Sequence, residues 1–337
     1  MIVTHDHREA VGRGLPALAT ELRDGDEVIV VDNDSSDGTP AAVRDAAPGA
    51  VVIEAGANLG FGAGCNRGAS AASGELLCFL NPDAVPAPGF RDALERPLAA
   101  GRGWGAWQGL VTAEGGRIVN TRGGVVHFTG IAWAGGAGAL TEAAADGLFE
   151  PAFVSGACLA IPRVTFERLG GFCEDFFLYH EDVDLSLRLR LVGERLGIEP
   201  EARVDHDYRF AKGPAKWRYL ERNRWATLIR TYPAALLALL APALVATEVA
   251  LVPISIAGGW FRQRLLAWGD VARSLPRLRQ ERRTIQSART VGAAQFALAL
   301  TADLDSPYLG GPARSRVLRG ALRAYWSAVL ALLGARE

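Results

Sequence analysis

The stretch VIVVDNDSSDGT, residues 28–39, places an apolar run directly before a crowd of polar side chains. Val28–Val31 are four consecutive apolar residues, a pattern typical of a strand buried on both faces of a parallel sheet. Carboxylates follow at positions 32, 34 and 37. Carboxylates this close repel one another unless cations, hydroxyls or backbone N–H groups compensate them. The stretch therefore predicts a buried strand that ends at a polar site.

Strand-like and helix-like segments alternate around this stretch. We expect strands at residues 2–4, 27–33, 50–56 and 75–83, and helices at residues 8–22, 37–47 and 60–72. This alternation predicts βαβ units with right-handed crossovers, and so an α/β fold with a Rossmann-like, mostly parallel sheet.

The ends of these strands are polar. Thr4 and His5, Asp32 and Asn33, Asn58, and Asn81–Asp83 follow successive strands. Ligands of open α/β sheets bind beyond the carboxyl ends of the strands, so these residues predict a binding site at that rim. A turn that only caps the next helix is the alternative for residues 32–37, but it does not explain why every strand end is polar.

Composition limits the class of protein. The 337 residues are 49% hydrophobic and 22% charged, so a large buried core is expected. The net charge of −1 argues against a nucleic-acid-binding protein. The four cysteines form no CxxC pair, which favours reduced thiols over a zinc site. No basic segment followed by an apolar one begins the chain, so we expect no secretory signal.

Residues 101–148 are rich in glycine and predict irregular structure. We expect antiparallel strands around residues 116–128 and a loop that shapes a pocket. Trp133 lies in this region and is a candidate for the pocket or the acceptor side.

Residues 181–192 predict an amphipathic helix, because Val183, Leu187 and Leu191 recur at intervals of four. Glu181 and Asp182 then lie in its first turn. Acidic residues there also simply favour the positive end of the helix dipole, by about 0.3–1 kcal/mol each. The aromatic residues that precede them favour a second interpretation, a carboxylate that acts as a general base.

Five motifs together resemble the family 2 inverting glycosyltransferases, and in particular bacterial rhamnosyltransferase-type members that build cell-wall and surface polysaccharides. The motifs occur in order as VVDNDSSDGT (30–39), NLGFGAGCNRG (58–68), LNPDA (80–84), VSGACLAIPR (154–163) and GGFCEDFFLYHEDVDLSLRLR (170–190). The resemblance covers residues 2–232 and implies a GT-A domain that binds a nucleotide-sugar.

The resemblance implies a role for each matching residue. Asp182 corresponds to the catalytic base, and Glu181 lies beside it on the acceptor side. The nucleotide-sugar would be bound by Thr4, Asp32, Asn33, Asn58, Gly60, Phe61, Asn66 and Asp83. Of these, Asp32 and Asn33 would hold the nucleoside, while residues 34–37 would shape the turn and cap the helix.

The resemblance also implies a divalent cation, Mg²⁺ or Mn²⁺, on the diphosphate. The family usually has an Asp-X-Asp motif, but here it is Asn81-Pro82-Asp83, and only the last acid remains. His206 resembles the histidine that completes the metal site in some relatives. A lone histidine is more often structural, and that alternative stays open.

The expected activity is therefore that of an inverting hexosyltransferase with a single displacement. It would move a sugar, with rhamnose as a candidate, from a dTDP- or UDP-sugar to a lipid-linked or polysaccharide acceptor in cell-envelope glycan synthesis. A catalytically inactive glycosyltransferase fold that serves as a scaffold or binding protein at the membrane is the alternative. A nucleotidyltransferase is disfavoured, because it would need a basic glycine-rich signature after the first strand.

The end of the chain has a different character. We expect the GT-A domain over residues 1–215 and a helical, membrane-associating region over residues 216–337. Residues 234–260 are apolar enough to cross a bilayer, but Pro242, Glu248 and Pro253 interrupt them. They predict helices in the membrane interface, with a true span or a helix buried in a soluble homodimer as alternatives.

Eight arginines that follow would suit an anionic lipid surface: Arg262, Arg264, Arg273, Arg277, Arg279, Arg282, Arg283 and Arg289. The expected location is the cytoplasmic face of the membrane, as a peripheral protein, or the cytoplasm.

Overall fold

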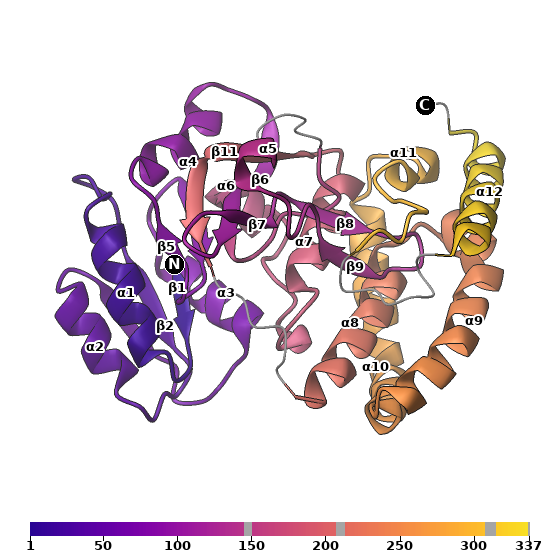
Figure 1. The fold of residues 1–337 in the computed structure, drawn as a ribbon, viewed down its shortest axis with the longest axis horizontal. Helices are drawn as coiled ribbons and strands as arrows, with labels where there is room; N and C mark the ends of the chain where they lie inside the picture. The colour runs from indigo at the N-terminus through magenta and orange to yellow at the C-terminus, as the bar shows by residue number, and fades with distance from the viewer. Residues whose placement is uncertain (145–149, 207–212, 307–314, 336–337) are drawn as a thin grey trace. The chain divides into compact units, whose positions relative to one another are not determined.

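The computed structural model describes residues 1–144, 150–206, 213–306 and 315–335 (Figure 1). The chain divides into two units. The first consists of Met1–Gly124, Ala134–Ser186 and Glu194–Tyr208, and the second of Val125–Trp133, Leu187–Gly193 and Arg209–Glu337. The domain boundary that we expect after residue 215 stays a prediction, because a compact unit need not fold independently.

The first unit begins with the predicted βαβ units. Its first sheet has the order β1-β2-β3, and both pairs are parallel. The strands are β1 (Ile2–Thr4), β2 (Ile29–Asp32) and β3 (Val51–Glu54), and the helices between and after them are α1 (Arg8–Ala19), α2 (Thr39–Ala46) and α3 (Phe61–Ala71). The parallel register places Thr4 opposite Asp32, so that two polar strand ends lie side by side.

Burial explains the apolar run of β2. All four of its residues are buried, because neighbouring strands flank it and helices pack on the sheet. Val30 belongs to a core cluster with Val11 and Leu15 of α1 and Val43 of α2. The sequence pattern that predicts a doubly buried strand is therefore confirmed.

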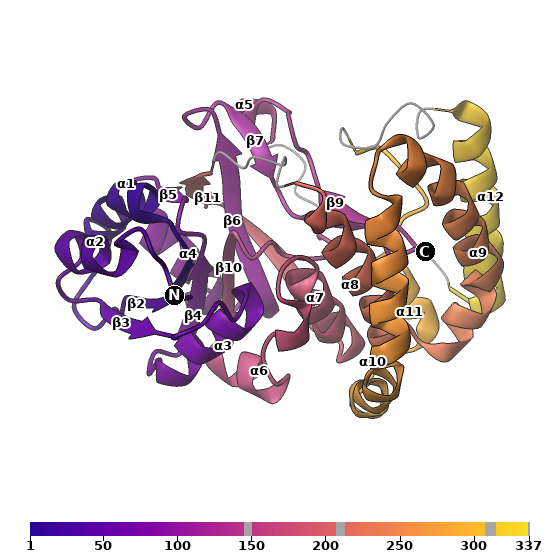
Figure 2. The ribbon, with the colours of Figure 1, turned by 90° about the horizontal axis from the view of Figure 1, so that it is seen from below.

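The second sheet departs from the mostly parallel sheet that we expected. Its order is β4-β10-β6-β11-β5, with β7 paired to β6 (Figure 2). In this sheet only β6 and β11 pair in parallel, and the other pairs are antiparallel. The strands are β4 (Leu76–Leu80), β5 (Val85–Pro86), β6 (Trp104–Ala113), β7 (Ile118–Thr121), β10 (Cys158–Pro162) and β11 (Arg195–Asp205). Loops rather than crossover helices connect several of these strands, which permits antiparallel pairing.

Strand β6 lies inside the segment that we expected to be irregular. Eight of its ten residues are buried, and it pairs with both β10 and β11. It is not predicted as a strand because it contains glycines, which are uncommon in strand interiors. A Cβ at Gly109 would lie 2.2 Å from the carbonyl oxygen of Ala202, so only glycine allows the two backbones to approach this closely.

The remaining elements of the first unit are α4 (Phe90–Ala99), β8 (Gly124–Val126), β9 (Ala132–Ala134), α5 (Thr141–Ala144), α6 (Arg163–Arg168), the 3₁₀ helix η1 (Glu174–Phe176) and α7 (Glu181–Leu191). Three of them, β8, β9 and α7, also contribute residues to the second unit. The antiparallel strands expected around residues 116–128 are present as β7, which pairs with β6, and β8, which pairs with β9. The helix expected at residues 181–192 is present as α7, but it is not amphipathic: only Asp182 and Arg190 are partly exposed, and its other nine residues are buried.

The second unit is mainly helical. It contains α8 (Ala215–Thr231), α9 (Ala234–Ala257), α10 (Phe261–Ser287), α11 (Ala293–Ala297) and α12 (Arg316–Leu333). Among the described residues, α9 is the one helix that is long and apolar enough to cross a membrane. Length and composition alone do not distinguish a span from other apolar helices.

Several arginines expected at a lipid surface instead stabilise the second unit. Arg264 is fully buried. Arg282 donates to the carbonyl oxygens of Ile229, at 2.6 Å, and Tyr232, at 2.7 Å, near the end of α8. Arg273 pairs with Asp270 at 3.1 Å, but its side chain is 70% exposed and remains at the surface. The arginine-rich composition therefore has a partly structural cause.

Candidate functional site

The carboxylate of Asp32 is held at the end of β2 by three protein donors. Thr4 Oγ1 donates to Oδ1 at 2.7 Å, and Ser35 donates through Oγ to Oδ1 at 2.6 Å and through its backbone N–H to Oδ2 at 2.9 Å. Both Thr4 and Asp32 are buried. These bonds fix the carboxylate in one orientation at the rim of the first sheet.

Asn33 connects this rim to the turn that precedes α3. Its amide nitrogen Nδ2 donates to the carbonyl oxygen of Gly60 at 3.0 Å. Its side-chain oxygen Oδ1 is buried and has no hydrogen-bond partner within the described part of the chain. A buried acceptor without a donor is costly, so this oxygen is suited to receive an N–H or O–H group from a ligand.

Asp37 shows how one of the crowded carboxylates is compensated by backbone N–H groups. Its Oδ1 accepts from the backbone N–H of Thr39 at 2.9 Å, and its Oδ2 accepts from the backbone N–H of Arg8 at 3.0 Å. One side chain therefore satisfies N–H groups at the starts of both α1 and α2. Asp34, by contrast, is exposed and has a φ of 63°.

Gly60 lies where the turn before α3 meets the segment before α7. Asn58 Oδ1 accepts from the N–H of Gly60 at 3.1 Å, and the N–H of Phe61 donates to the carbonyl oxygen of Phe177 at 2.7 Å. Gly60 has a φ of 84°, and a Cβ there would lie 2.3 Å from the oxygen of Phe177. Glycine is required at this position by both backbone conformation and space.

Both ends of the Asn66 amide are hydrogen-bonded within the first unit, and its place in the nucleotide-sugar pocket stays a prediction. Its Nδ2 donates to the carbonyl oxygen of Phe172 and to Glu174 Oε1, each at 3.0 Å, and its Oδ1 accepts from the N–H of Phe172 at 2.9 Å. Both ends of this amide therefore hold the loop before α7 against α3.

Asp83, in the turn between β4 and β5, and His206, directly after β11, meet where these strands of the second sheet end. His206 Nε2 lies 3.0 Å from Asp83 Oδ1 and 3.4 Å from Asn81 Nδ2. Burial acts to raise the pKa of Asp83, but the hydrogen bond and charge of His206 outweigh it, and the net effect lowers that pKa. The carboxylate is therefore ionised at neutral pH.

These two side chains could supply one oxygen and one nitrogen ligand to a divalent cation. Within the described residues no group of three or more His, Cys, Asp or Glu side chains could hold a metal. A cation here would take its other ligands from water and from a ligand's phosphate oxygens, as Mg²⁺ commonly does.

Glu181 and Asp182 form an acidic pair at the start of α7. Asp182 Oδ2 accepts from the N–H of Gly156 at 3.1 Å, and its Oδ1 accepts from the N–H of Val183 at 2.8 Å. Burial raises the pKa of Asp182, and the two N–H groups oppose that rise. Burial, followed by the charge of Asp182, raises the pKa of Glu181 to about 8. Burial therefore disfavours the charged form of both carboxyls, and the two N–H groups favour a charge on Asp182.

Two links bring these groups into one region of the first unit. A Cβ at Gly156 would lie 3.0 Å from the ring of Phe61 and 3.9 Å from Cβ of Asp182, so these side chains converge on this glycine. The next residue, Ala157, accepts from the N–H of Asn81 at 3.1 Å, which connects the Asp83 turn to the same loop.

The sequence motifs contain Gly156 but do not indicate its role, and they give no sign of the strained backbone before α7. Phe177, Tyr179 and His180 have φ values of 62°, 70° and 69°. Non-glycine residues rarely adopt such values, and they cluster at functional sites. No glycine marks these positions, so the sequence carries no local signal for them. Trp133 is buried in β9 of the second unit, and its role stays a prediction.

Comparisons with known proteins agree on one family. A model of glycosyl transferase family 2 matches residues 1–117. An N-acetylglucosaminyl-diphospho-decaprenol L-rhamnosyltransferase of Mycobacterium tuberculosis is 31% identical over 255 residues, which are 67% of this chain and 81% of that protein. The O-antigen biosynthesis protein RfbC of Myxococcus xanthus is 35% identical over 152 residues, 42% of this chain and 12% of that protein.

Solved structures agree on the fold. A crystal structure of GalNAc-T7 with UDP, GalNAc and Mn²⁺ matches with a TM-score of 0.63 and 16% identity, over 91% of this chain and 57% of that chain. A crystal structure of S. aureus TarS matches with a TM-score of 0.54 and 14% identity, over 98% of this chain and 53% of that chain. At these identities the likeness concerns the fold alone, and it confirms the GT-A-like α/β fold that the motifs predict.

Proposed function

The chain belongs to glycosyl transferase family 2 and is a glycosyltransferase, and we propose that it transfers L-rhamnose from a nucleotide-sugar to a lipid-linked acceptor. The name of its Mycobacterium tuberculosis relative supports both the sugar and a diphospho-polyprenol acceptor that carries N-acetylglucosamine. The acidic pair at the start of α7 is the observation that carries the proposal, because it supplies a carboxylate, oriented by two backbone N–H groups, that could remove a proton.

The nucleoside would lie at the rim of the first sheet. The fixed carboxylate of Asp32 and the buried oxygen of Asn33 supply acceptors for the N–H of a pyrimidine base or the hydroxyls of its ribose. Two acceptors in a buried setting favour a ligand rich in donors, since an unpaired acceptor costs about 1–3 kcal/mol. This supports a dTDP- or UDP-sugar as the donor.

The diphosphate would lie near Asp83 and His206, which would hold Mg²⁺ or Mn²⁺. When bound, the cation would stabilise the negative charge that grows on the leaving diphosphate. Asp83 keeps its charge because His206 lowers its pKa. His206, only 4% exposed in its side chain, keeps a fixed position against that carboxylate.

Asp182 would act as the general base. The acceptor hydroxyl oxygen forms a bond to the anomeric carbon while its proton passes to a carboxylate oxygen of Asp182. The bond from that carbon to the diphosphate oxygen breaks, and the nucleoside diphosphate leaves on the opposite side. This single displacement inverts the anomeric configuration. The N–H groups of Gly156 and Val183 aim the carboxylate, and Glu181 stays protonated beside it.

A donor panel tests this proposal. The purified chain is incubated with the N-acetylglucosaminyl-diphospho-polyprenol acceptor, dTDP-, UDP- and GDP-sugars and Mg²⁺ or Mn²⁺, and release of nucleoside diphosphate is measured with and without a chelator. We expect nucleoside diphosphate to be released only when dTDP-rhamnose is the donor. Chelation of the cation should abolish this release. No release from any donor, with nucleotide binding intact, would instead favour the catalytically inactive scaffold, for which Asn81 in place of the usual acid is the main support.

A further inference from the structure

The exposed face of α9 has the opposite polarity to that of a surface helix in a soluble protein. Its only polar residues are Thr247, Glu248 and Ser255, and none of these is exposed. Its exposed residues are all apolar: Ala234, Ala235, Ala238, Ala241, Pro242, Val245, Ala246, Val249, Ala250, Pro253, Ile254, Ile256 and Ala257. A water-facing helix normally carries polar residues on its outer face.

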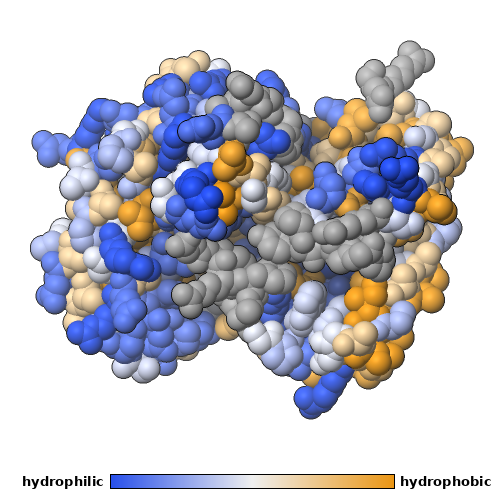
Figure 3. All heavy atoms as spheres, in the orientation of Figure 1, coloured by the Kyte–Doolittle hydropathy of each residue, from blue (hydrophilic) through white to orange (hydrophobic). Residues whose placement is uncertain are grey.

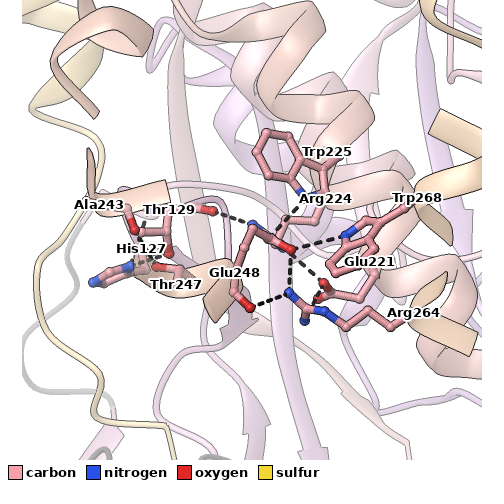
Figure 4. A network of polar contacts seen from close by, with 10 residues as sticks. All are labelled: His127, Thr129, Glu221, Arg224, Trp225, Ala243, Thr247, Glu248, Arg264 and Trp268. Carbon is pink, nitrogen blue, oxygen red and sulfur yellow. Dashed lines mark hydrogen bonds and ion pairs between the residues drawn. The ribbon is translucent and has the colours of Figure 1, made fainter. Parts of the chain in front are cut away.

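The charge of Glu248 is neutralised inside the second unit (Figure 4). Arg224 of α8 and Arg264 of α10 both donate to its carboxylate. The indole N–H groups of Trp225 and Trp268 also donate to it, each at 3.1 Å. The residue that interrupts the apolar sequence therefore points toward α8 and α10 and leaves the outer face of α9 without a charge.

Helix α12 extends this apolar face. Tyr325 Oη of α12 donates to the carbonyl oxygen of Leu239 in α9. Val317 and Leu332 of α12 are 82% and 73% exposed, which is unusual for such large apolar side chains. Figure 3 shows apolar residues gathered over both helices on the right of the view. The exposed residues of α9 with Val317 and Leu332 are called the apolar face below.

Charge is distributed unevenly between the two ends of the chain. Residues 213–337 contain 18 arginine and lysine residues and 7 aspartate and glutamate residues, whereas residues 1–212 contain 18 and 30. The strongly basic end is the one that carries the apolar face. A basic segment with an exposed apolar face is complementary to an anionic lipid surface, which offers both hydrocarbon and negative headgroups. A second copy of the chain would instead bring two basic regions together.

We propose that the apolar face lies on an anionic lipid bilayer, with α9 parallel to the membrane plane and not across it. A crossing would carry Glu248 and the arginines bound to it into hydrocarbon, together with the polar helices α8 and α10 from which those arginines come. In the parallel orientation the outer face of α9 enters the interface while these charges stay on the protein side.

Sedimentation with vesicles tests the proposal. The full chain is mixed with vesicles of phosphatidylcholine alone or of phosphatidylcholine with phosphatidylglycerol, without any sugar donor. We expect binding to the anionic vesicles that weakens with added salt. The double variant Val245→Glu, Val249→Glu should lose at least tenfold in binding, because both side chains, at 64% and 66% exposure, lie on the apolar face.

Val164→Glu is the matched control, since Val164 is a valine 71% exposed on α6, in the first unit. It should bind vesicles like the unchanged chain. Equal vesicle binding by the double variant, or a dimer that the double variant converts to monomer without any lipid effect, would overturn the proposal. The thermal midpoints of all variants are compared to verify that they fold.

Extraction of cell membranes distinguishes the two orientations. Alkaline carbonate should release the full chain into the soluble fraction if α9 lies on the surface. Retention in the membrane after carbonate, with release only by detergent, would contradict the parallel orientation.

Discussion

His206 Nε2 lies 3.0 Å from Oδ1 of Asp83, at a turn where the family's usual Asp-X-Asp motif has lost its first acid. His206, which directly follows β11 and is distant in sequence, stands beside the carboxylate that remains. If this pair holds a cation as proposed, a nitrogen ligand would stand where the motif usually supplies an oxygen, and binding of Mg²⁺ or Mn²⁺ would depend strongly on the Asp83 carboxylate.

Asp83→Asn should weaken the effect of the cation on nucleotide binding. The substitution removes the negative charge while keeping the size of the side chain. We expect Mn²⁺ to tighten dTDP or UDP binding by at least tenfold in the unchanged chain and by less than twofold in the variant, as measured by calorimetry. Asp34→Asn is the matched control, because Asp34 is exposed and asparagine tolerates its φ of 63°. Equal cation dependence in the two variants would refute the site.

Asp182→Asn should lower kcat for sugar transfer by a factor of about 10²–10⁴, the range that a general base contributes. Glu181→Gln should have a much smaller effect, because burial already keeps Glu181 protonated at neutral pH. Transfer rates of the two variants under saturating donor are the measurement. A larger loss in Glu181→Gln than in Asp182→Asn would reverse the two assignments.

Glu181 should also make stability depend on pH. Its pKa is raised from 4.5 to about 8 in the folded chain. Between these values the folded state binds a proton that the unfolded state has lost, so the free energy of unfolding falls as pH rises through this window. Glu181→Gln should therefore gain thermal stability relative to the unchanged chain as pH increases from about 5 to 8. If the difference in melting temperature between the two chains stays constant over this pH range, the pKa of Glu181 is not raised by folding.

Gly60→Ala should destabilise the first unit and reduce donor affinity. Gly60 has φ 84° and ψ 176°, a conformation that costs other residues about 1–3 kcal/mol, and the added Cβ would overlap the oxygen of Phe177. Gly12→Ala, in the interior of α1 with no atom within 4 Å of the new Cβ, should instead stabilise by about 0.5–1 kcal/mol. Chemical denaturation gives both values. Similar changes in the free energy of unfolding for the two variants would contradict the close approach of Gly60 to Phe177.

Glu248→Ala should destabilise the second unit by up to about 3–5 kcal/mol, because it removes one of the two carboxylates that the buried Arg224 and Arg264 share and leaves them only Glu221. Asp303→Ala breaks an exposed pair with Arg323 and should cost less than about 1 kcal/mol. Calorimetric melting curves compare the two. A loss for Glu248→Ala no larger than that of the exposed pair would indicate that the cluster is solvated.

Much of the first unit can be predicted from local sequence. The buried strand β2, the helix α7 and the polar strand ends follow from apolar runs, periodicity and turn residues, all of which act over a few positions. Strand β6 cannot be predicted in this way. Its glycines serve a close approach to Ala202, a residue far along the chain, and glycine by itself disfavours a strand.

The candidate site can likewise be predicted only in part from local sequence. The motifs identify Asp182 and Asp83, but they do not reveal that Gly156 orients the first or that Asn66 is bound at both ends of its amide. Glu248 gives the clearest case in the second unit. As a charge within an apolar run it argues against a span, yet only the partners Arg224 and Arg264 explain how the helix accepts it.

Transfer of L-rhamnose from dTDP-L-rhamnose to N-acetylglucosaminyl-diphospho-polyprenol, in the presence of Mg²⁺, tests the central claim most directly. Chromatography of the lipid product would follow a labelled sugar for the unchanged chain and for Asp182→Asn. We predict a disaccharide-lipid with inverted anomeric configuration for the unchanged chain and at least a hundredfold less for the variant. No labelled lipid from the unchanged chain, or the same yield from the variant, would contradict the proposed reaction or its base.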